Sequence, residues 1–418
     1  MQNSGDEIRH DTVCRLCGSS RVLAVMSLAP TPAEDQFVTS DERSLTQKCY
    51  PLDLALCQQC EYVYLPYILN PEISYPNYTY VSKVTVGLSN HYQEYADDLL
   101  SRFAIAADAL VVDLGSNDGT MLEAFKLRGR AVLGVEPGRA VSKIAQEAGI
   151  PTINAFFTSD TVSEIVAGYG RPKLVTANYM FANIDDLRDF TNNVAALLDD
   201  EGIFSVQTGY HPEHFKLLMF DYIYHEHFSY FTAARIESLF RQSGLELIFV
   251  QKTSAKGGSV RFIAQKLGAK RSVDRSVEEI LAEEVREEVS SPKWFADFSQ
   301  RLLARRNEVR QLLEGLKASG KSIVGYGASH STTTLIYHFG LADFIDKLVD
   351  DNPIKHGRYS PGLHLPVSSS SSLLEGLPDY VFILGWQHQN SIIDRNREYL
   401  KRGGKFIVPM PDLKIISA

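Results

Sequence analysis

The residues with the greatest capacity for chemistry lie close together, in segment 220–231. It reads Phe-Asp-Tyr-Ile-Tyr-His-Glu-His-Phe-Ser-Tyr-Phe, so phenols, imidazoles and carboxylates crowd a short stretch. Histidine exchanges protons near neutral pH, and a neighbouring phenol or carboxylate can fix its tautomer. In an extended chain Tyr224 and Glu226 share one face, while His225 and His227 share the other. The segment therefore predicts acid–base chemistry. A packed aromatic strand is one alternative, and a zinc site is disfavoured because His-Glu-His lacks the His-Glu-x-x-His spacing.

The cysteines form a second group, because all five lie before residue 61. Four of them make two Cys-x-x-Cys pairs, Cys14 with Cys17 and Cys57 with Cys60, and Cys49 stands apart as a packed thiol. Two such pairs are typical of a tetrahedral zinc site, although a redox pair or unrelated buried cysteines are alternatives. Four thiolates leave no open position for a substrate. We therefore expect a structural zinc ion that stabilises a module with a small core.

A glycine-containing turn follows the first apolar run of the middle segment. Residues 109–120 read Ala-Leu-Val-Val-Asp-Leu-Gly-Ser-Asn-Asp-Gly-Thr, with Gly115 and Gly119 in the turn. A helical stretch over 121–128 and a second apolar run over 131–135 come next. This pattern predicts a strand, turn, helix and parallel strand, with glycines where a ligand approaches the backbone.

The acidic residue that closes the second strand indicates a nucleoside ligand. Glu136 lies about 20 residues after the turn, the spacing at which a carboxylate accepts ribose hydroxyls. The turn, Asp113-Leu-Gly-Ser-Asn117-Asp-Gly119, is not Gly-x-Gly-x-x-Gly and resembles the first motif of S-adenosylmethionine-dependent methyltransferases. The resemblance implies that Gly115 and Gly119 make room for the methionine end and that Glu136 holds the ribose. A doubly wound fold that binds a nicotinamide cofactor is the alternative.

Two further segments extend this predicted donor site. Asn154-Ala-Phe-Phe157 falls where such folds flank the adenine, and segment 173–178 predicts the next parallel strand. Ligands bind beyond the carboxyl ends of such strands, so residues 179–184 should face the methyl group. Asn178 either contacts the donor or caps the strand. The candidate cofactor residues are Asp113, Gly115, Asn117, Gly119, Glu136, Phe156 and Asn178.

Several motifs together resemble the sugar C-methyltransferases of deoxysugar biosynthesis, which act on nucleotide-linked ketosugars. Beyond the cysteine pairs, the Asp113 turn and Ile-Tyr-His-Glu-His, they are Tyr50-Pro-Leu, Tyr78-Thr-Tyr80-Val-Ser82, Gly257-Gly-Ser259-Val-Arg261 and Pro361-Gly-x-His-x-Pro366. The similarity covers nearly the whole chain. It implies that Tyr78, Tyr224, Glu226 and His227 surround the sugar.

One position departs from this family. The family often has histidine in an Asn-x-x-x-Ala-His-Ile pattern, whereas this chain has Asn178-Tyr-Met-Phe-Ala-Asn183-Ile. Asparagine can hydrogen-bond a sugar but does not titrate near pH 7. We therefore expect His227, oriented by Glu226 or Tyr224, to remove the proton beside the ketone, with C3 favoured over C5. Tyr78, Tyr224 or Asn183 would donate to the oxyanion, and the carbanionic carbon would attack the sulfonium methyl group.

The C-terminal part repeats an α/β pattern. Segment 275–317 has helical periodicity, and segment 322–329, Ser-Ile-Val-Gly-Tyr-Gly-Ala-Ser, predicts a strand and a glycine turn before a helix over 332–339. Further strands are predicted over 344–349, 380–384 and 405–408. The turn suits a dinucleotide or the pyrophosphate of a nucleotide-sugar. Solvated loop charges are the alternative for Lys355 and Arg358. The candidate substrate residues are Tyr80, Ser82, Tyr222, Ser259, Arg261, Ser329, His330, Asn352, Lys355 and Arg358.

Composition and net charge limit the classes of protein and partner that are compatible with these interpretations. Hydrophobic residues make up 44% and charged residues 22%, which is typical of a globular protein. The net charge of −9 argues against nucleic-acid or anionic-membrane partners. The chain has neither an apolar run of ~20 residues nor a signal peptide, so we expect a cytoplasmic protein. The oligomeric state stays open, with a monomer as the default.

The predicted fold class is α/β in three parts. A zinc-binding module covers 1–75, a Rossmann-like methyltransferase domain covers 76–270, and a helical connector with a second Rossmann-like domain covers 271–418. The nucleotide-linked ketosugar would lie between the last two parts. Three other functions stay open: a nicotinamide-dependent sugar oxidoreductase using the Gly-Tyr-Gly turn, a zinc-dependent scaffold or nucleic-acid binder, and an O- or N-methyltransferase.

Overall fold

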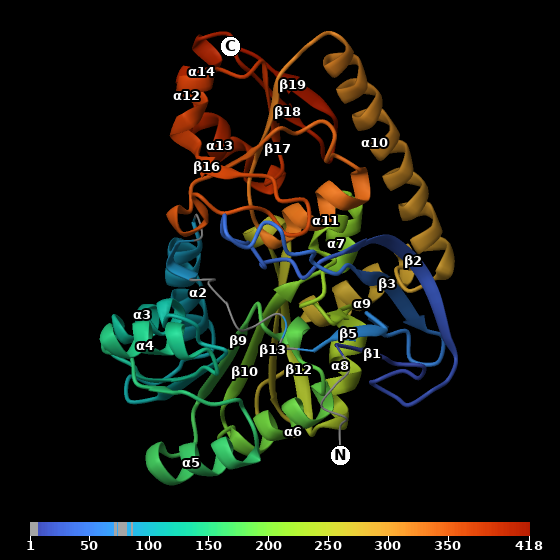
Figure 1. Ribbon diagram of the computed structural model, residues 1–418. Coiled ribbons are helices and arrows are strands. Elements are labelled where there is room, and N and C mark those ends of the chain that lie inside the picture. Colours follow the sequence, from blue (N-terminus) through green and yellow to red (C-terminus); the bar gives the residue numbers. More distant parts are fainter. Residues whose placement is uncertain (1–6, 71–72, 74–81, 85–86) are drawn as a thin grey trace.

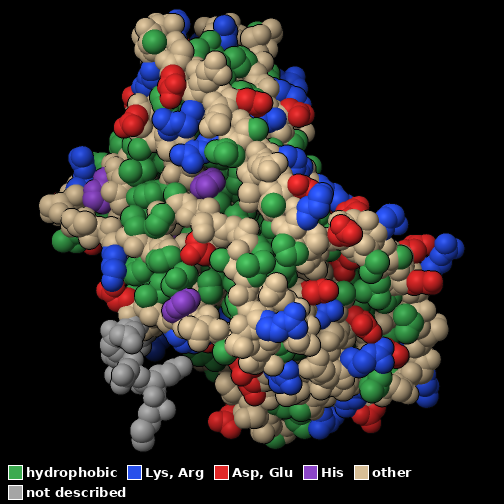
Figure 2. All heavy atoms as spheres, turned by 90° about the vertical axis from the view of Figure 1, so that its right-hand side faces the viewer, with side chains coloured by type: hydrophobic (Ala, Val, Ile, Leu, Met, Phe, Trp, Pro, Cys, Tyr) green, Lys and Arg blue, Asp and Glu red, His purple; other side chains and the backbone are tan. Residues whose placement is uncertain are grey.

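The chain forms two large α/β units with a smaller sheet beside their junction (Figure 1). The computed structural model describes residues 7–70, 73, 82–84 and 87–418. Within these ranges no helix combines the length and the apolar character needed to cross a membrane. On the face drawn in Figure 2, acidic and basic side chains are interspersed, so the acidic excess of the chain is not gathered in one patch there.

A seven-stranded sheet of order β12-β13-β10-β9-β6-β7-β8 carries the middle of the chain. Its strands are β6 (Leu110–Leu114), β7 (Ala131–Val135), β8 (Thr152–Ile153), β9 (Leu174–Asn178), β10 (Ile203–Gly209), β12 (Leu245–Thr253) and β13 (Ser259–Lys266). Its helices are α2 (Leu88–Arg102), α3 (Thr120–Lys126), α4 (Arg139–Glu147), α5 (Ser159–Tyr169), α6 (Leu187–Leu197), α7 (His211–Lys216) and α8 (Ala233–Gln242). Strands β8 to β10 run parallel with β6 and β7, whereas β13 is antiparallel to both neighbours. All five residues of β9 are buried, as is typical of a parallel strand covered on both faces.

A six-stranded sheet of order β16-β15-β14-β17-β18-β19 forms the C-terminal unit. Its strands are β14 (Ile323–Tyr326), β15 (Leu348–Asp350), β16 (Val367–Ser369), β17 (Tyr380–Ile383), β18 (Lys405–Val408) and β19 (Lys414–Ile416). Its helices are α11 (His330–Phe339), α12 (Leu373–Gly376), α13 (Gln389–Arg395) and α14 (Arg397–Lys401). The strand predicted over 344–349 is wrong at its start. Phe344 and Ile345 are buried but lie before β15, and β14 pairs with β15 only from Leu348 onward.

The connector contains two helices, not one. Helix α9 (Arg275–Glu287) packs on α8 and β12, and helix α10 (Pro292–Ala318) follows a break at which Glu288 has a positive φ of 50°. Proline at the first position of α10 explains the new start, since its missing N–H would be unpaired there in any helix. The helical prediction for 275–317 is therefore confirmed apart from this break.

The N-terminal part forms a four-stranded sheet of order β11-β4-β3-β2. Its strands are β2 (Val22–Thr31), β3 (Tyr50–Cys57), β4 (Val63–Tyr64) and β11 (Ser229–Tyr230), and β1 (Ile8–His10) pairs separately with β5 (Tyr67–Leu69). Strand β11 comes from the middle of the chain and lies near the end of segment 220–231, which we call the reactive stretch. The sheet also shares one apolar core with the C-terminal unit, in which Leu28 and Leu54 belong to the same cluster as Phe339. The three predicted parts are therefore packed together through side chains far apart in sequence.

A buried carboxylate joins the reactive stretch to the C-terminal unit. Asp221 lies in η3 (Phe220–Tyr222), and its Oδ2 accepts hydrogen bonds from Trp386 Nε1 at 3.0 Å and from Gln387 Nε2 at 2.9 Å, both in η7 (Trp386–His388). Its Oδ1 is buried without a hydrogen-bond partner among the described residues. Burial raises the pKa of Asp221 to about 7 although both hydrogen bonds lower it.

This raised pKa predicts a pH-dependent stability. Between the ordinary pKa of 3.8 and about 7 the folded state holds a proton that the unfolded state has lost, so this group destabilises the fold progressively as pH rises through that window. We expect Asp221→Asn to melt ~2–4 °C above the parent protein at pH 8 and near it at pH 5, in calorimetric scans. A difference that is the same at both pH values would show that this carboxyl does not titrate in that window.

Candidate active site

A cavity of about 620 Å³ lies where the two large sheets meet the reactive stretch. Its wall includes Tyr179 and Asn183 after β9, Gly327 in the turn after β14, and His330 at the start of α11. The reactive stretch supplies Tyr222, Tyr224, Glu226, His227, Ser229 and Tyr230, and predicted substrate residues Ser259, Ser329, Asn352 and Lys355 also line the cavity. The volume lies within the range of small-molecule sites.

The reactive stretch is a turn, so the faces predicted for an extended strand are wrong. The backbone N–H of His227 donates to the carbonyl oxygen of Tyr224 at 2.9 Å, and regular strand pairing begins only at Ser229. The turn brings together the side chains that alternation had placed on opposite faces. Tyr224 Oη lies 2.8 Å from His227 Nε2, with ring centroids 4.0 Å apart.

The contacts of His227 define its protonation. Nδ1 lies 2.9 Å from the carbonyl oxygen of Tyr222, an acceptor, so Nδ1 carries the proton. Nε2 is then a lone-pair acceptor for the Tyr224 hydroxyl. Burial lowers the pKa of His227 to about 3 and raises the pKa of Tyr224 well above its usual range. The pair is therefore neutral at working pH, with the lone pair of His227 Nε2 held at the cavity.

A second imidazole on the same cavity has the opposite charge state. His330 Nε2 lies 3.6 Å from Glu226 Oε1. Burial acts to lower the pKa of His330, but the carboxylates of Asp35 and Glu226 raise it to about 9. His330 is consequently a cation at neutral pH. Two titratable groups whose surroundings push their pKa values apart are typical of an acid–base site.

His225 points away from the cavity and holds the turn. Its backbone N and its ring Nδ1 both lie 2.6 Å from Glu34 Oε1, and both side chains are buried. Burial acts against both charges, but the ion pair lowers the pKa of Glu34 and raises that of His225. Sequence reasoning missed Glu34 and the neighbouring Asp35, because no motif surrounds them and they meet the reactive stretch only in three dimensions.

The predicted donor turn has the geometry that its glycines require. Gly115 and Gly119 have positive φ values of 68° and 79°. A Cβ on Gly115 would lie 2.8 Å from Met180 Cγ, so this turn abuts the segment that lines the cavity. The Glu136 carboxylate accepts hydrogen bonds from the backbone N–H of Asn117 at 2.9 Å and of Gly138 at 2.7 Å. It is thereby fixed at the end of β7, where a ribose would be held.

Asp113 ties the carboxyl ends of two neighbouring strands. Its Oδ1 accepts hydrogen bonds from Thr176 Oγ1 at 2.5 Å and Asn178 Nδ2 at 3.2 Å. Burial raises the pKa of Asp113 to about 7. Asn178 Oδ1 is buried without a hydrogen-bond partner among the described residues, so Asn178 both braces β9 and keeps an acceptor available.

Several candidate residues lie elsewhere. Ser82 donates its backbone N–H to Asn117 Oδ1 at 2.9 Å, beside the donor turn, and Phe156 is 72% exposed. Arg261 is buried, with its guanidinium carbon 3.3 Å from the Tyr95 ring centroid, and like Arg358 it does not line the cavity. Tyr78 and Tyr80 lie outside the described residues.

Lys355 differs from the solvated loop charge that was considered for it. Its side chain is buried, and Nζ donates to Asp35 Oδ1 at 2.9 Å and to the carbonyl oxygen of Ala328 at 2.5 Å. The ammonium group therefore joins the N-terminal module to the glycine turn before α11.

Two residues with left-handed backbone mark one part of the wall: Tyr179, which belongs to the predicted segment 179–184, and Lys256, which the sequence analysis did not single out. Tyr179 and Lys256 have φ values of 56° and 49°, and the Lys256 ammonium lies 4.1 Å from the Tyr179 ring centroid. Gln207 Nε2 donates to Tyr179 Oη at 2.9 Å. Non-glycine residues in this conformation are held by their surroundings and cluster at functional sites.

The four predicted metal ligands meet at the edge of the N-terminal sheet. The Sγ atoms of Cys14, Cys17, Cys57 and Cys60 all lie within 4.8 Å of one another. Cys14 lies 3.7 Å from Cys60, and Cys17 lies 3.6 Å from Cys57. A zinc tetrahedron with Zn–S bonds of about 2.3 Å has edges of about 3.8 Å, so the thiols fit this ion. The set is closed and supports a structural role.

Comparisons with known proteins cover all three parts. Residues 14–75 match a zinc binding domain, residues 88–250 a methyltransferase domain, and residues 254–411 the C-methyltransferase C-terminal domain. The chain is 33% identical over 414 residues to the C-methyltransferase NovU of Streptomyces niveus, covering 99% of each chain.

Solved methyltransferases resemble a smaller part of the chain. The CcbJ methyltransferase of Streptomyces caelestis is 15% identical, with a TM-score of 0.34, and the match covers 42% of this chain and 90% of that one. Magnesium protoporphyrin IX methyltransferase of Synechocystis with bound S-adenosylhomocysteine is 14% identical, with a TM-score of 0.35, and covers 43% and 84%.

The thiol cluster predicts a specific effect of single cysteine variants. We expect Cys57→Ser to lose most of its bound zinc and to melt at least ~5 °C lower, because the ion contributes directly to the folding free energy of such a module. Zinc is measured by mass spectrometry and melting by calorimetry. Cys49 is exposed, so the prediction of a packed thiol is wrong, and it lies outside the cluster. Cys49→Ser is therefore the matched control and should keep both values. Equal zinc content in the two variants would contradict the assignment.

Proposed function

Since this chain belongs to the S-adenosylmethionine-dependent C-methyltransferases, we propose that it methylates a ring carbon beside the ketone of a nucleotide-linked 4-keto-deoxysugar through an enolate. The motif resemblance around Tyr224, Glu226 and His227 supports a sugar substrate. The observation that carries the proposal is the pairing of the neutral imidazole of His227 with the cationic imidazole of His330 on one cavity.

Proton removal is assigned to the pair Tyr224–His227. The C–H bond beside the ketone breaks, and its proton reaches His227 Nε2 either directly or through Tyr224 Oη, which lies 2.8 Å from it. Tyr224 would pass its own proton to Nε2 as it accepts the proton from carbon. The low pKa of His227 reflects the cost of a buried cation, and a developing enolate nearby offsets that cost electrostatically.

The oxyanion has two candidate donors on the cavity wall. His330 is a cation that can donate from its ring, and its charge is held by Glu226 and Asp35. Asn183 carries two amide N–H donors and has a buried Oδ1 without a hydrogen-bond partner among the described residues. Donors fixed before the reaction stabilise the enolate without reorganisation. Asn183 thus would serve as a hydrogen-bonding group rather than as a base.

The donor would lie on the other side of segment 179–183. Glu136 and the turn 115–119 would hold S-adenosylmethionine, which supplies an electrophilic methyl group when bound. The enolate carbon then forms the new C–C bond as the S–CH₃ bond breaks, and S-adenosylhomocysteine leaves. Met180 contacts the donor turn while Tyr179 and Asn183 line the cavity, which supports an in-line approach between the two sites. Such positioning can supply ~7–11 kcal/mol of the barrier.

The nucleotide end is assigned to the C-terminal unit. Residues 326–331 line the cavity as the chain enters α11. The backbone N–H groups of Gly327, Ala328 and Ser329 donate within this unit, so it is the N-terminus of α11 that favours an anion. Asn352 and Lys355 lie on the same wall, and Arg395 is paired there with Asp351 at 2.9 Å. This supports a pyrophosphate beside the turn, with the sugar directed toward His227.

Removal of the assigned base should abolish turnover. We expect His227→Asn to lose at least ~100-fold in turnover while S-adenosylmethionine affinity stays within about twofold, since acid–base catalysis contributes 10²–10⁴-fold and the donor turn is separate. Turnover is measured by transfer of a labelled methyl group, and donor affinity by calorimetry. Near-parental turnover would remove His227 from the mechanism.

The substrate class is tested by the product. We expect the labelled methyl group to pass to a nucleotide 4-ketosugar in a mass-spectrometric panel and to appear on a ring carbon in the NMR spectrum of the product. A methyl group on oxygen or nitrogen, or no transfer to any member of a panel covering thymidine, uridine and guanosine diphosphate ketosugars, would contradict the proposal.

A further inference from the structure

We propose that Arg15, which lies between the first two cysteines of the zinc cluster, is a positioning residue. It fixes the distance between two walls of the cavity, the segment that contains Asn183 and the turn that contains His227. Nothing in the motif analysis assigns this arginine a role. The inference rests on the proposed function, because it takes the turn 224–227 as the site of proton transfer.

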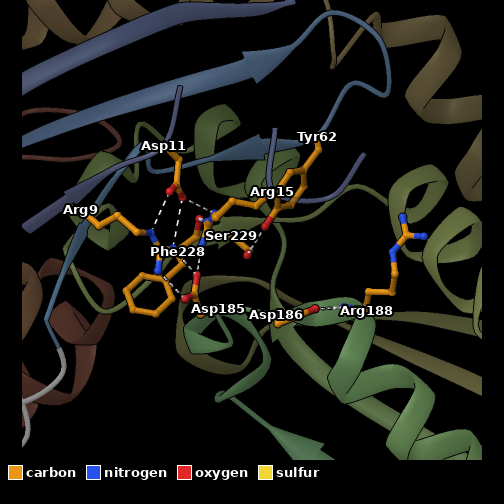
Figure 3. Close-up of polar contacts among 9 residues, drawn as sticks. All are labelled: Arg9, Asp11, Arg15, Tyr62, Asp185, Asp186, Arg188, Phe228 and Ser229. Carbon is orange, nitrogen blue, oxygen red and sulfur yellow. Dashed lines mark hydrogen bonds and ion pairs between the residues drawn. The ribbon is translucent and has the colours of Figure 1, made fainter. Parts of the chain in front are cut away.

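One guanidinium reaches two segments that adjoin the reacting groups (Figure 3). Arg15 Nη2 donates to the carbonyl oxygen of Phe228 at 2.8 Å, and Nη1 donates to Asp185 Oδ1 at 3.0 Å. Phe228 directly follows His227, and Asp185 comes two residues after Asn183. The distance between the two walls is therefore set through a single rigid, planar group.

The surroundings of Arg15 strengthen these two hydrogen bonds. Its side chain is only 9% exposed, and its guanidinium carbon lies 5.4 Å from the Tyr64 ring and 5.7 Å from the Phe228 ring. Asp11 Oδ2 lies 3.3 Å from Nε and adds a second carboxylate to the charge balance. Charge-assisted hydrogen bonds in such partly desolvated places are among the stronger ones. Lysine has a single ammonium and lacks the fork needed for both acceptors.

The two segments that carry the zinc ligands contact the same two walls at neighbouring residues. Tyr62 Oη lies 2.5 Å from Ser229 Oγ, and Arg188 Nη2 donates to the carbonyl oxygen of Leu16 at 2.7 Å. The first contact holds the end of the reactive stretch, and the second holds the start of α6 against the loop 14–17, which carries two of the zinc ligands. Arg15 joins these two attachments. The loop 14–17, which carries two of the zinc ligands, is thereby the rigid element that sets the distance between the two walls.

A neighbouring arginine offers a matched control. Arg9 makes a bidentate pair with Asp185 at 2.8 and 2.7 Å and bonds Asp11 at 2.8 Å, so it shares both carboxylates with Arg15. Its side chain is 42% exposed, and its hydrogen bonds run to these carboxylates and not to Phe228. Arg9→Met removes the same charge from the same cluster while leaving the bond to the reactive stretch.

The test compares Arg15→Met with Arg9→Met in the full chain. Hydrogen exchange is followed by mass spectrometry with S-adenosylmethionine present, and turnover is measured with a thymidine diphosphate 4-keto-6-deoxyhexose. For Arg15→Met we expect about tenfold faster exchange in 183–187 and 224–231, and kcat lowered ~10–100-fold, the loss typical of small misplacements of reacting groups. Zinc content and donor affinity should stay within twofold. Arg9→Met should leave exchange in 224–231 and kcat within about twofold of the parent.

Two results would overturn the inference. One is parental exchange in 224–231 for Arg15→Met, and the other is an equal rise over the seven-stranded sheet, which would indicate general destabilisation. Arg15→Lys, which keeps the charge, is measured in the same way against the parent protein and tests the inference if Arg15→Met does not fold. We expect it to retain less than half of the parent kcat, because an ammonium group lacks the fork that reaches both acceptors. If exchange changes as expected but the parent protein turns over no ketosugar, the proposed function fails and the spacing role of Arg15 stands.

Discussion

The pairing of Ser229–Tyr230 with Val63–Tyr64 is the contact on which the rest of the site depends. It ends the turn that contains Tyr224 and His227 and joins that turn to a sheet that has the zinc ligands at its edge, with Cys57 as the last residue of β3. It acts together with the Glu34–His225 ion pair, which holds the turn itself. Because strand pairing fixes register, the position of one two-residue strand decides which side chains of the stretch enter the cavity.

Charge is distributed over the cavity by groups from all three parts of the chain. Asp35 comes from the N-terminal module, Glu226 from the reactive stretch, and His330 and Lys355 from the C-terminal unit. The two carboxylates make one imidazole a cation, whereas burial keeps His227 neutral, and the charges of Lys256 and His330 act in the same direction. The acid–base character of the site is thus a property of the assembly of the three parts, because no single part contains both charge states.

The donor side and the acceptor side are built differently. The donor turn is local: β6, its glycines and β7 follow one another in sequence, and Glu136 is held by backbone N–H groups within the same unit. The cavity instead joins side chains from residue 35 to residue 395. Variation in the cavity can therefore change the acceptor while the donor turn stays intact, and Asn183 is one position where this chain departs from the resemblance.

The sequence by itself determined the features that depend on local spacing. The two cysteine pairs, the strand over 131–135, the turn with Gly115 and Gly119, and the carboxylate of Glu136 were all readable, since each needs only a few neighbouring residues. Tertiary structure alone decided that His225 turns to Glu34 while His227 turns to Tyr224, and that Lys355 is buried against Asp35. Alternation along the chain assumes a strand, and only the pairing of β11 with β4 shows that a turn precedes it. Desolvation and charge pairing, which set the pKa values of both imidazoles, depend on neighbours that the order of residues does not reveal.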